Sequence, residues 1–342
     1  MEKILTISIA AYNVEEFIEK TLNSLIIKEI EKLEIIVVND GSKDRTKEIV
    51  EKYVEKYPKS VKLINKENGG YGSTINTSIK LATGKYFKQL DGDDWYNTKN
   101  LESLVKKLED IDADIVYTPM ITVYTDLKKE KEERELWEKI SKIYNSKNIF
   151  NLKDIVELAP KRIGMHSLAY KTELLKKNNI KCLEKCFYTD TEYEFYPFLY
   201  SKSIFVFEEP IYYYRIGREG QSVSIEGLRK NYRDIIKVLD TIIAGYSKEK
   251  LEYEMKDYCD KLIVSVINFL LKAFVVLPAS KESFEIISKE IKRIEKKYNF
   301  FYQNTLKNKK GLSKILYSNF SKNYIYYKIL KFAFDRKNKI KN

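Results

Sequence analysis

The sequence has 342 residues, enough for one large α/β domain with an additional segment. Its 44% hydrophobic content is typical of a globular protein, and three cysteines with a single histidine exclude a disulfide framework and argue against a zinc site. The cysteines are expected to be reduced, and the start Met1-Glu2-Lys3 leads into a strand rather than a signal peptide. Both features predict a cytoplasmic protein.

The net charge of +12 is concentrated at the end of the sequence. Residues 301–342 contain eleven Lys and Arg residues against one acid, Asp335, and so supply +10 of that charge. A basic segment that also contains Tyr and Phe predicts contact with an anionic surface, which lipid and nucleic acid both offer. A solvated terminal helix is the alternative.

Apolar runs of strand length alternate with helical patterns over the first 118 residues. Strands are expected at 4–10, 33–38, 61–65, 85–90 and 113–118, and a helix follows each of the first four. Leu33–Val38 is almost continuously apolar, as in a strand buried on both faces of a parallel sheet. Asn13 with Glu16 has the pattern of a helix capping box. This order predicts right-handed βαβ units and a doubly wound, mostly parallel sheet flanked by helices.

Ligands bind such sheets outside the carboxyl ends of the strands. Tyr12, Asp40 and Asp93 follow the first, second and fourth strands, so three loops are expected to converge on one crevice. Asp93 belongs to the run Asp91-Gly92-Asp93-Asp94, whose first and third carboxylates can both turn toward one hard cation, Mg²⁺ or Mn²⁺. The alternative is an acidic turn that caps the helix starting near Thr98.

The pattern is weaker beyond residue 118. Residues 126–150 are highly charged and predict an exposed loop or helix that would act as a spacer. A helix is expected over Thr191–Tyr200, a strand over Ser203–Glu208 and a mobile loop over Gly217–Ser224.

A domain boundary is predicted near residue 225, because the pattern beyond it is helical. Residues 1–225 would form the α/β domain and residues 226–342 a helical, basic region. Leu262–Ala279 is the most apolar stretch, but Asn268 and Lys272 interrupt it, which makes it a weak candidate for a transmembrane helix. We expect this helix to pack on the α/β domain or to lie at a membrane surface.

Four motifs, in this order, resemble those of family 2 glycosyltransferases, which have the GT-A fold. They are Ile9-Ala10-Ala11-Tyr12-Asn13, Val38-Asn39-Asp40-Gly41-Ser42, Asn68-Gly69-Gly70 and Leu90-Asp91-Gly92-Asp93-Asp94. Their order and spacing match over residues 4–95, and a weaker resemblance continues through Asp190 to residue 224. The resemblance implies an inverting transfer of a sugar from a nucleotide donor, commonly a UDP-sugar, to an acceptor hydroxyl.

Carried over by position, the resemblance also implies a donor site. Ala10, Tyr12 and Glu15 would line the base pocket, and Asp40 would accept a hydrogen bond from the base. Asp91 would lie near the ribose and the metal, and Asp93 would bind the cation, Mn²⁺ or Mg²⁺, that bridges the two phosphates. The donor site would further include Asn68, Gly69, Gly92 and Arg215.

An inverting displacement needs a base that takes the acceptor proton. In this family the base is acidic and lies in a Glu-Asp motif, to which Thr189-Asp190 corresponds here, so Asp190 is the candidate. Thr189 stands where Glu is usual, which leaves Glu192 as a substitute for an auxiliary carboxylate. The alternative role for Asp190 is the N-cap of the following helix.

Two further parts of the site are less well defined. Ile75 stands where the family often has an arginine, so the diphosphate would be met by the metal alone, by Lys66 or Lys88, or by Arg215. His166, in Gly164-Met165-His166, is a candidate for the acceptor side, with a structural hydrogen bond as the alternative. The loop Gly217–Ser224 would close over the phosphates as a lid, or would be an ordinary connection.

Other functions fit the sequence less well. A Rossmann dehydrogenase would need Gly-x-Gly-x-x-Gly after the first strand, and a kinase would need a Walker A motif. A metal-dependent nucleotidyltransferase remains an alternative, as does a non-enzymatic protein that binds an anionic surface. We expect a saccharide or lipid-linked acceptor, contact of the basic tail with the inner face of the membrane, and no nucleic-acid partner.

Overall fold

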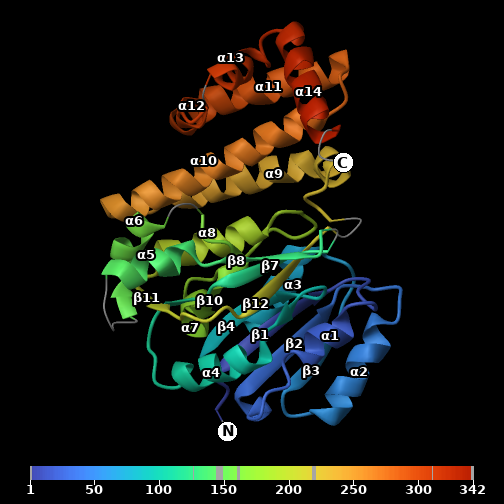
Figure 1. The fold of residues 1–342 in the computed structure, drawn as a ribbon, viewed down its shortest axis with the longest axis vertical. Coiled ribbons are helices and arrows are strands. Elements are labelled where there is room, and N and C mark those ends of the chain that lie inside the picture. Colours follow the sequence, from blue (N-terminus) through green and yellow to red (C-terminus); the bar gives the residue numbers. More distant parts are fainter. Residues whose placement is uncertain are drawn as a thin grey trace. The chain divides into compact units, whose positions relative to one another are not determined.

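The computed structural model describes residues 2–125, 127–143, 149–159, 162–217, 221–309 and 311–339. They form two compact units (Figure 1). The first comprises Met1–Arg218 and Glu249–Lys256, and the second comprises Glu219–Lys248 and Asp257–Asn342. The predicted boundary near residue 225 stays a prediction.

The first unit is built around an eight-stranded sheet of strand order β3-β2-β1-β4-β10-β6-β11-β9. Four of these strands, β1 to β4, precede or carry the predicted motifs, and the pairs β3–β2, β2–β1 and β1–β4 are all parallel. The strands are β1 (Leu5–Ala11), β2 (Leu33–Asn39), β3 (Val61–Asn65), β4 (Tyr86–Asp91), β6 (Ile115–Tyr117), β9 (Ile149–Asn151), β10 (Leu168–Lys171) and β11 (Ser203–Val206). All residues of β2 are buried, as its apolar run predicts. The predicted mostly parallel α/β sheet is confirmed.

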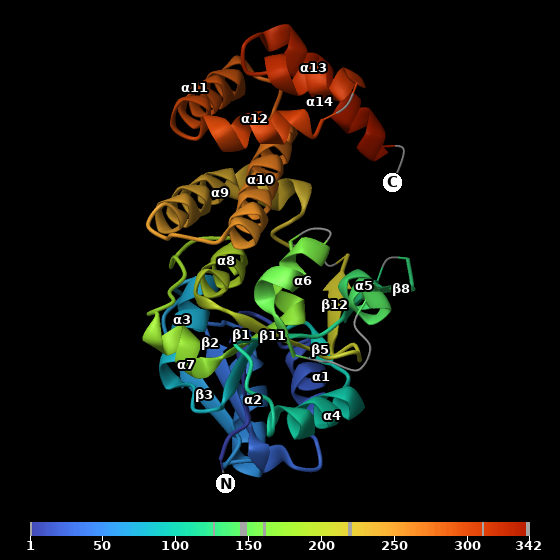
Figure 2. The same ribbon diagram turned by 90° about the vertical axis from the view of Figure 1, so that its left-hand side faces the viewer.

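Helices cover both faces of this sheet (Figure 2). Alternate residues of β1, Leu5, Ile7 and Ile9, share one core with the helices of the first face, because successive side chains of a strand point to opposite faces. The helices of this face are α1 (Ile18–Asn23), α2 (Thr46–Lys56) and α4 (Thr98–Leu108). Those of the opposite face are α3 (Tyr71–Leu81), α7 (Thr172–Lys177) and α8 (Asp190–Tyr200). This is the doubly wound arrangement.

Strand β10 runs antiparallel to both of its neighbours, β4 and β6. In its register Ala169 pairs with Lys88 and Tyr170 with Phe87. The residues that precede β10 therefore lie beside the carboxyl end of β4. This places the short 3₁₀ turn η2 (Met165–Ser167), which contains His166, next to Asp91.

A second sheet of order β5-β12-β7-β8 belongs to the same unit. Its strands are β5 (Trp95–Tyr96), β7 (Met120–Tyr124), β8 (Lys129–Glu133) and β12 (Tyr212–Ile216). The edge strand β8 consists of Lys and Glu and is exposed over its first four residues, as predicted, but it is a strand where a loop or helix was expected. The unit is completed by η1 (Ile30–Lys32), α5 (Glu135–Ile143) and α6 (Leu152–Leu158).

The predicted capping box at Asn13 is wrong. Helix α1 begins at Ile18 without a side-chain cap. Asn13 has a positive φ of 51°, which asparagine tolerates better than most residues. Its Oδ1 accepts a hydrogen bond of 2.8 Å from the Lys43 amide, so this side chain joins the loops after β1 and β2 instead of capping a helix.

The second unit is helical over its described residues. Its elements are α9 (Ile225–Tyr246), α10 (Tyr253–Val276, from Asp257 onward), α11 (Lys281–Lys297), α12 (Asn299–Lys307), α13 (Gly311–Asn319) and α14 (Tyr324–Lys339). Apolar residues of α9, such as Leu239 and Ile242, are fully buried, as are Ile263 and Leu270 of α10. Among the residues that the structure describes, no helix is both long enough and apolar enough to cross a membrane.

Candidate active site

The acidic run lies at the carboxyl end of β4, at the edge of the sheet where the sequence predicts a ligand site. Asp91 is the last residue of β4, and a turn closed by the Asp94 amide and the Asp91 carbonyl follows, at 3.1 Å. The run does not cap α4, because Asn97 is the N-cap and its side chain accepts a hydrogen bond from the Asn100 amide. Capping of α4 is therefore not the role of the acidic run.

Two carboxylates and an imidazole meet in this crevice. Ligand atoms of Asp91, Asp94 and His166 lie within 4.8 Å of one another, a spacing at which they could hold one metal ion. The sequence predicted Asp91 together with Asp93. The carbonyl oxygen of Asp93 accepts a hydrogen bond of 2.9 Å from Nε of Arg215.

The electrostatics of the cluster favour a bound cation. Burial, followed by the nearby charges of Asp91 and Asp93, raises the pKa of the Asp94 carboxyl well above its usual value. Burial also lowers the pKa of His166 to about 3, helped by Lys88 and Arg162, so the imidazole is neutral and retains a lone pair at neutral pH.

Tyrosines from distant segments fix the carboxylates. The Tyr212 hydroxyl on β12 accepts a hydrogen bond from the Asp91 amide at 3.1 Å and donates one to Oδ2 of Asp94 at 2.7 Å. The Arg215 amide donates to Oδ1 of Asp94 at 2.8 Å, and the Tyr71 hydroxyl donates to Oδ1 of Asp91 at 2.6 Å. Both sheets therefore contribute to the acidic cluster. The sequence motifs gave no signal for Tyr71, and Tyr212 was visible only as part of an aromatic run.

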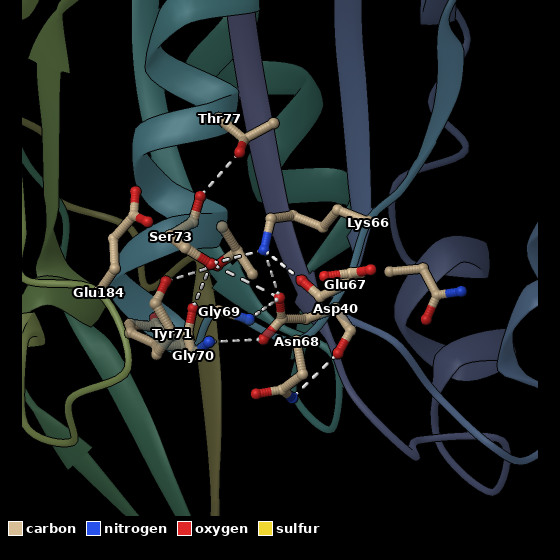
Figure 3. A network of polar contacts seen from close by, with 12 residues as sticks. Asp40, Lys66, Glu67, Asn68, Gly69, Gly70, Tyr71, Ser73, Thr77 and Glu184 are labelled. Atoms are coloured by element: carbon tan, nitrogen blue, oxygen red, sulfur yellow. Dashed lines mark hydrogen bonds and ion pairs between the residues drawn. The ribbon is translucent and has the colours of Figure 1, made fainter.

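Asp40, at the end of β2, accepts hydrogen bonds from the loop after β3 (Figure 3). Its Oδ1 accepts from the Gly69 amide at 2.9 Å, and its Oδ2 accepts from the Gly70 amide at 2.8 Å. The Asn68 side chain donates to the Asp40 carbonyl at 3.0 Å. Two of the predicted motifs are thus joined through a single carboxylate.

The three side chains considered for the diphosphate lie in different surroundings. The Lys66 ammonium donates to Oδ1 of Asp40 at 2.8 Å. Lys88 is fully buried, and its ammonium donates to the His166 carbonyl at 2.8 Å, which places it beneath the crevice. The Arg215 guanidinium lies between the rings of Phe17 and Trp95, 4.8 and 5.0 Å from their centroids.

Asp190, the candidate base, is the first residue of α8. Its carboxylate forms an ion pair of 3.3 Å with Arg162, which also contacts the buried carboxylate of Glu194. Burial raises the pKa of Tyr71, and the charges of Asp91 and Asp190 both add to this effect. Asp190 and the acidic cluster therefore influence the same hydroxyl. The sequence gave no signal for Arg162 or Glu194.

Glu192, considered as a substitute for the missing acid, is bound within the protein. Glu192 is almost fully buried, and its Oε2 accepts a hydrogen bond of 2.8 Å from the Leu183 amide. Burial raises the pKa of Glu192 to about 7, with a smaller contribution from Asp190. These contacts indicate a structural role, holding the segment before α8.

The segment 181–189, here called the base loop, is attached to α3. Asn76 accepts a hydrogen bond from the Cys182 amide and donates one to the Cys182 carbonyl, each of 2.9 Å. At Gly72 an added Cβ would lie 2.0 Å from the Leu183 carbonyl oxygen, so no other residue fits there. The loop also contains Tyr188, whose positive φ of 64° is unusual for an aromatic residue.

The other predicted residues line the same edge. Ala10 is paired with Asp91 in the β1–β4 register, and Tyr12 is 52% exposed just beyond it. Glu15 accepts hydrogen bonds from the amide and Nε of Arg45. Gly92 is buried against β1, where an added Cβ would lie 2.9 Å from the Ala10 carbonyl oxygen. Part of the predicted lid, residues 218–220, lies outside the described residues.

A hollow of about 770 Å³ in the first unit lies at the opposite edge of the sheet. It is lined by the end of β10 at Lys171, the start of β11 at Lys202 and the segment around Leu251. None of the predicted site residues lines this hollow.

Comparison with known proteins identifies the family. Residues 6–167 match the sequence profile described as Glycosyl transferase family 2. The chain therefore carries a family 2 glycosyltransferase domain, and the resemblance noted from its four motifs is confirmed. The fold is the GT-A fold of this family.

Two curated relatives illustrate the similarity. The chain is 39% identical over 116 residues to the uncharacterized glycosyltransferase EpsJ of Bacillus subtilis, a match that covers 34% of this chain and 33% of EpsJ. It is 28% identical over 255 residues to the poly(ribitol-phosphate) beta-N-acetylglucosaminyltransferase TarS of Staphylococcus aureus, over 74% of this chain and 42% of TarS. The chain thus spans less than half of the length of these relatives.

Solved structures extend the similarity of fold to almost the whole chain. TarS residues 1–349 in complex with UDP align with a TM-score of 0.67 at 20% identity, over 98% of this chain and 92% of that one. The mannosyltransferase PcManGT of Pyrobaculum calidifontis, in complex with GDP-Man and Mn²⁺, aligns with a TM-score of 0.52 at 14% identity, over 97% and 88%.

Proposed function

We propose that this protein is an inverting, metal-dependent glycosyltransferase that moves a sugar from a UDP-sugar to an acceptor hydroxyl in cell-surface polysaccharide or glycolipid synthesis. The observation that supports the proposal is the acidic cluster of Asp91, Asp94 and His166 in a family 2 domain. The charges of Asp91 and Asp190 both act on the hydroxyl of Tyr71, and Asp40 is bound by the turn that precedes Tyr71. The similarity to TarS, named as an N-acetylglucosaminyltransferase, makes UDP-GlcNAc the first donor to test.

The donor set of the crevice fits a divalent cation. Asp91, Asp94 and His166 would hold Mn²⁺ or Mg²⁺, with Asp93 as the ligand expected from the sequence. When bound, the ion would neutralise charge on the departing nucleoside diphosphate. Arg215 would bind a phosphate, Asp40 the base, and Ala10, Tyr12 and Glu15 would border the base pocket. Asn68 and Gly69 position Asp40, and Gly92 allows β1 and β4 to lie close together.

Asp190 is proposed to take the proton of the acceptor hydroxyl as its oxygen attacks the sugar. Arg162 would orient the carboxylate, since it contacts Asp190 at 3.3 Å and is itself held by Glu194. The aromatic surroundings of His166, with Tyr214 at 4.2 Å between ring centroids, form the acceptor side of the crevice in this proposal.

The test is calorimetric titration of UDP, with GDP and CDP as comparators, with and without Mn²⁺. Wild type is expected to bind UDP in the presence of Mn²⁺, and Asp91→Asn, Asp93→Asn and Asp94→Asn identify which carboxylates this binding needs. Asp190→Asn should bind UDP as wild type does but release UDP from UDP-GlcNAc at least about 100-fold more slowly in the presence of acceptor. A folded wild-type protein that binds none of the nucleotides would refute the proposal.

We also propose that the protein is cytoplasmic and contacts the inner face of the membrane through α14. On this helix Ile325, Ile329 and Phe332 are 65%, 46% and 68% exposed and lie at helical spacing on one face. Lys322, Lys328 and Arg336 are exposed among them. An apolar stripe bordered by basic residues is the pattern of a helix that lies in the surface of an anionic bilayer.

A further inference from the structure

A buried carboxylate on α8 is hydrogen-bonded both to the partner of the candidate base and to the turn that carries His166. Glu194 follows Asp190 by four residues on this helix, so the two side chains lie on the same helix face. On the basis of the proposed function, we propose that Glu194 is a positioning residue for the base. Acting through Arg162, it fixes the Asp190 carboxylate relative to the acidic cluster.

The two oxygens of Glu194 bind two ends of one short segment. Oε1 accepts a hydrogen bond of 2.8 Å from the Met165 amide, and Oε2 accepts one from Nε of Arg162. The Glu194 side chain is only 3% exposed, and a buried carboxylate without donors would be costly. Glu194 therefore holds residues 162–165 against α8.

Arg162 carries this position over to the base. Its Nη2 lies 3.3 Å from Oδ2 of Asp190 and donates to Oγ1 of Thr191 at 3.1 Å. A guanidinium is planar and its donors form a rigid fork, so the direction of Nε toward Glu194 also sets the direction of Nη2. The Asp190 side chain is 36% exposed at the start of α8, and this contact restricts its rotamer.

The other end of the segment contacts the acidic cluster. Sδ of Met165 lies 3.2 Å from the hydroxyl of Tyr71, which donates to Oδ1 of Asp91 at 2.6 Å. The residue after Met165 is His166, whose imidazole belongs to the cluster. The amide that binds Glu194 thus belongs to the turn that supplies a group of the cluster.

These contacts form one path between the cluster and the base. Its members are Asp91, Tyr71, Met165, Glu194, Arg162 and Asp190. In an inverting displacement the acceptor oxygen attacks the sugar while the base takes its proton, so the base must be correctly placed relative to the bound donor. A misplacement of about 1 Å can slow such a step by about 100-fold.

Glu194→Gln separates the two ends of this path. Glutamine keeps an oxygen that can accept from the Met165 amide, but its NH₂ group cannot accept from Nε of Arg162. The contact with the turn that carries His166 should remain, and the contact that orients Arg162 should be lost. The substitution should therefore slow turnover and leave nucleotide binding largely unchanged.

The experiment measures release of UDP from UDP-GlcNAc, with water in place of the acceptor hydroxyl, together with the dissociation constant of UDP in the presence of Mn²⁺. Both are measured at pH 8, above the value of about 7 to which burial raises the pKa of Glu194, so that this carboxyl is charged in wild type. Glu194→Gln should lower kcat by about tenfold or more and change the UDP affinity by less than about threefold.

Glu34→Gln is the matched control, because it makes the same substitution at another buried carboxylate. The Glu34 side chain is 1% exposed near the amino end of β2, where it accepts from Oγ1 of Thr6 at 2.6 Å and from Lys62 at 2.7 Å. This variant should lose stability but keep kcat and UDP affinity, per folded molecule, within about twofold of wild type. An equal loss of kcat in both variants would show a structural role for Glu194 and overturn the inference.

A double variant tests whether Glu194 acts through the base. In an Asp190→Asn background there is no base to position, so Glu194→Gln should change kcat by less than about a further twofold. A further tenfold loss would show that Glu194 acts elsewhere. If Glu194→Gln does not fold, Arg162→Lys, which keeps the cation beside Glu194 but lacks the planar fork, should show the same loss of kcat.

The outcomes separate the inference from the function on which it rests. A slow Asp190→Asn variant together with a Glu194→Gln variant of unchanged kcat overturns the role of Glu194 and leaves the proposed base in place. An Asp190→Asn variant that releases UDP as fast as wild type refutes the base, and the inference with it. A folded wild type that hydrolyses neither UDP-GlcNAc nor UDP-glucose contradicts both proposals.

Discussion

A single histidine occupies the acidic crevice, and its position follows from the reversal of one strand. His166 precedes the antiparallel strand β10, so the register brings it opposite Asp91. Its carbonyl is fixed by the buried Lys88, and its ring lies against Tyr212 and Tyr214 at 4.8 and 4.2 Å between centroids. An imidazole held on three sides is suited to a ligand role, because little freedom is lost when a cation binds.

His166→Ala should weaken Mn²⁺-dependent binding of UDP by at least about tenfold, because the cluster loses its only nitrogen ligand. The measurement is the UDP affinity at a series of Mn²⁺ concentrations. The metal-independent part of UDP binding should remain, since the Asp40 network does not include His166. Equal Mn²⁺ dependence in variant and wild type would remove His166 from the ligand set.

The base loop leads into α8 and is hydrogen-bonded to α3 and to the turn before α3. The Lys185 amide donates to the Gly69 carbonyl at 2.5 Å, and Asn76 holds Cys182 by two hydrogen bonds. The loop is therefore attached both to the turn that binds Asp40 and to the helix behind it. A loop fixed at two points can keep an acid at its end in place for catalysis.

Asn76→Ala should lower the free energy of unfolding by about 1–3 kcal/mol, because two buried backbone groups of Cys182 lose their partner. It should also slow turnover more than it weakens UDP binding, since Asp190 lies at the end of the loop. Urea denaturation and steady-state kinetics measure the two effects. Asn178→Ala is the control, because among the described residues the Asn178 side chain donates to the Leu174 carbonyl of α7 alone. The free energy of unfolding of this variant should change by less than about 1 kcal/mol.

Glu192 makes the stability of α8 depend on pH. Burial raises the pKa of this carboxyl to about 7, against 4.5 in the unfolded chain. Between these values the native state binds more protons than the unfolded state, so the free energy of unfolding falls as the pH rises from 4.5 to 7.

Glu192→Gln, which is neutral at every pH, should remove this contribution. The variant and wild type should be equally stable near pH 4.5, and the variant should be more stable at pH 8 by roughly 2–3 kcal/mol. Chemical denaturation across this pH range measures the difference. Parallel pH profiles for the two proteins would show that Glu192 titrates normally in the fold.

The elements differ in how far the sequence could predict them. Strands β1 to β4 follow from long apolar runs, and the helices between them follow from periodicity, because local chemistry determines both. The reversal of β10 could not be predicted, since its four residues carry no signal of direction. The contacts of Tyr71 with Asp91 and of Arg162 with Asp190 depend on which segments meet in space. A local motif does not contain that information.

At the scale of the whole molecule, charge is separated along the sequence. Residues 301–342 supply +10 of the net +12, and α14 adds an exposed apolar stripe to this charge. A surface that combines both features should bind anionic bilayers in a salt-dependent manner.

The protein should float with vesicles that contain phosphatidylglycerol at low salt and not with pure phosphatidylcholine vesicles. Phe332→Glu should reduce this binding by about tenfold, because it removes an inserted ring and adds a like charge to the lipid. Ile143→Glu, at a residue that is 56% exposed on α5, is the control and should bind as wild type does. Equal flotation of Phe332→Glu and Ile143→Glu would exclude α14 as the membrane contact. Binding to nucleic acid but not to vesicles would favour nucleic acid as the anionic partner.

The hydroxyl of Tyr212, which joins Asp91 to Asp94, has a consequence for biosynthesis. A ribosome completes β4 more than one hundred residues before it synthesises β12, as the numbers 91 and 212 show. Until then Asp91 and Asp94 lack the Tyr212 hydroxyl and the Arg215 amide, to which they are hydrogen-bonded in the folded protein. Their mutual repulsion should keep this edge of the sheet open, and the crevice should close only when the last strand of the domain arrives.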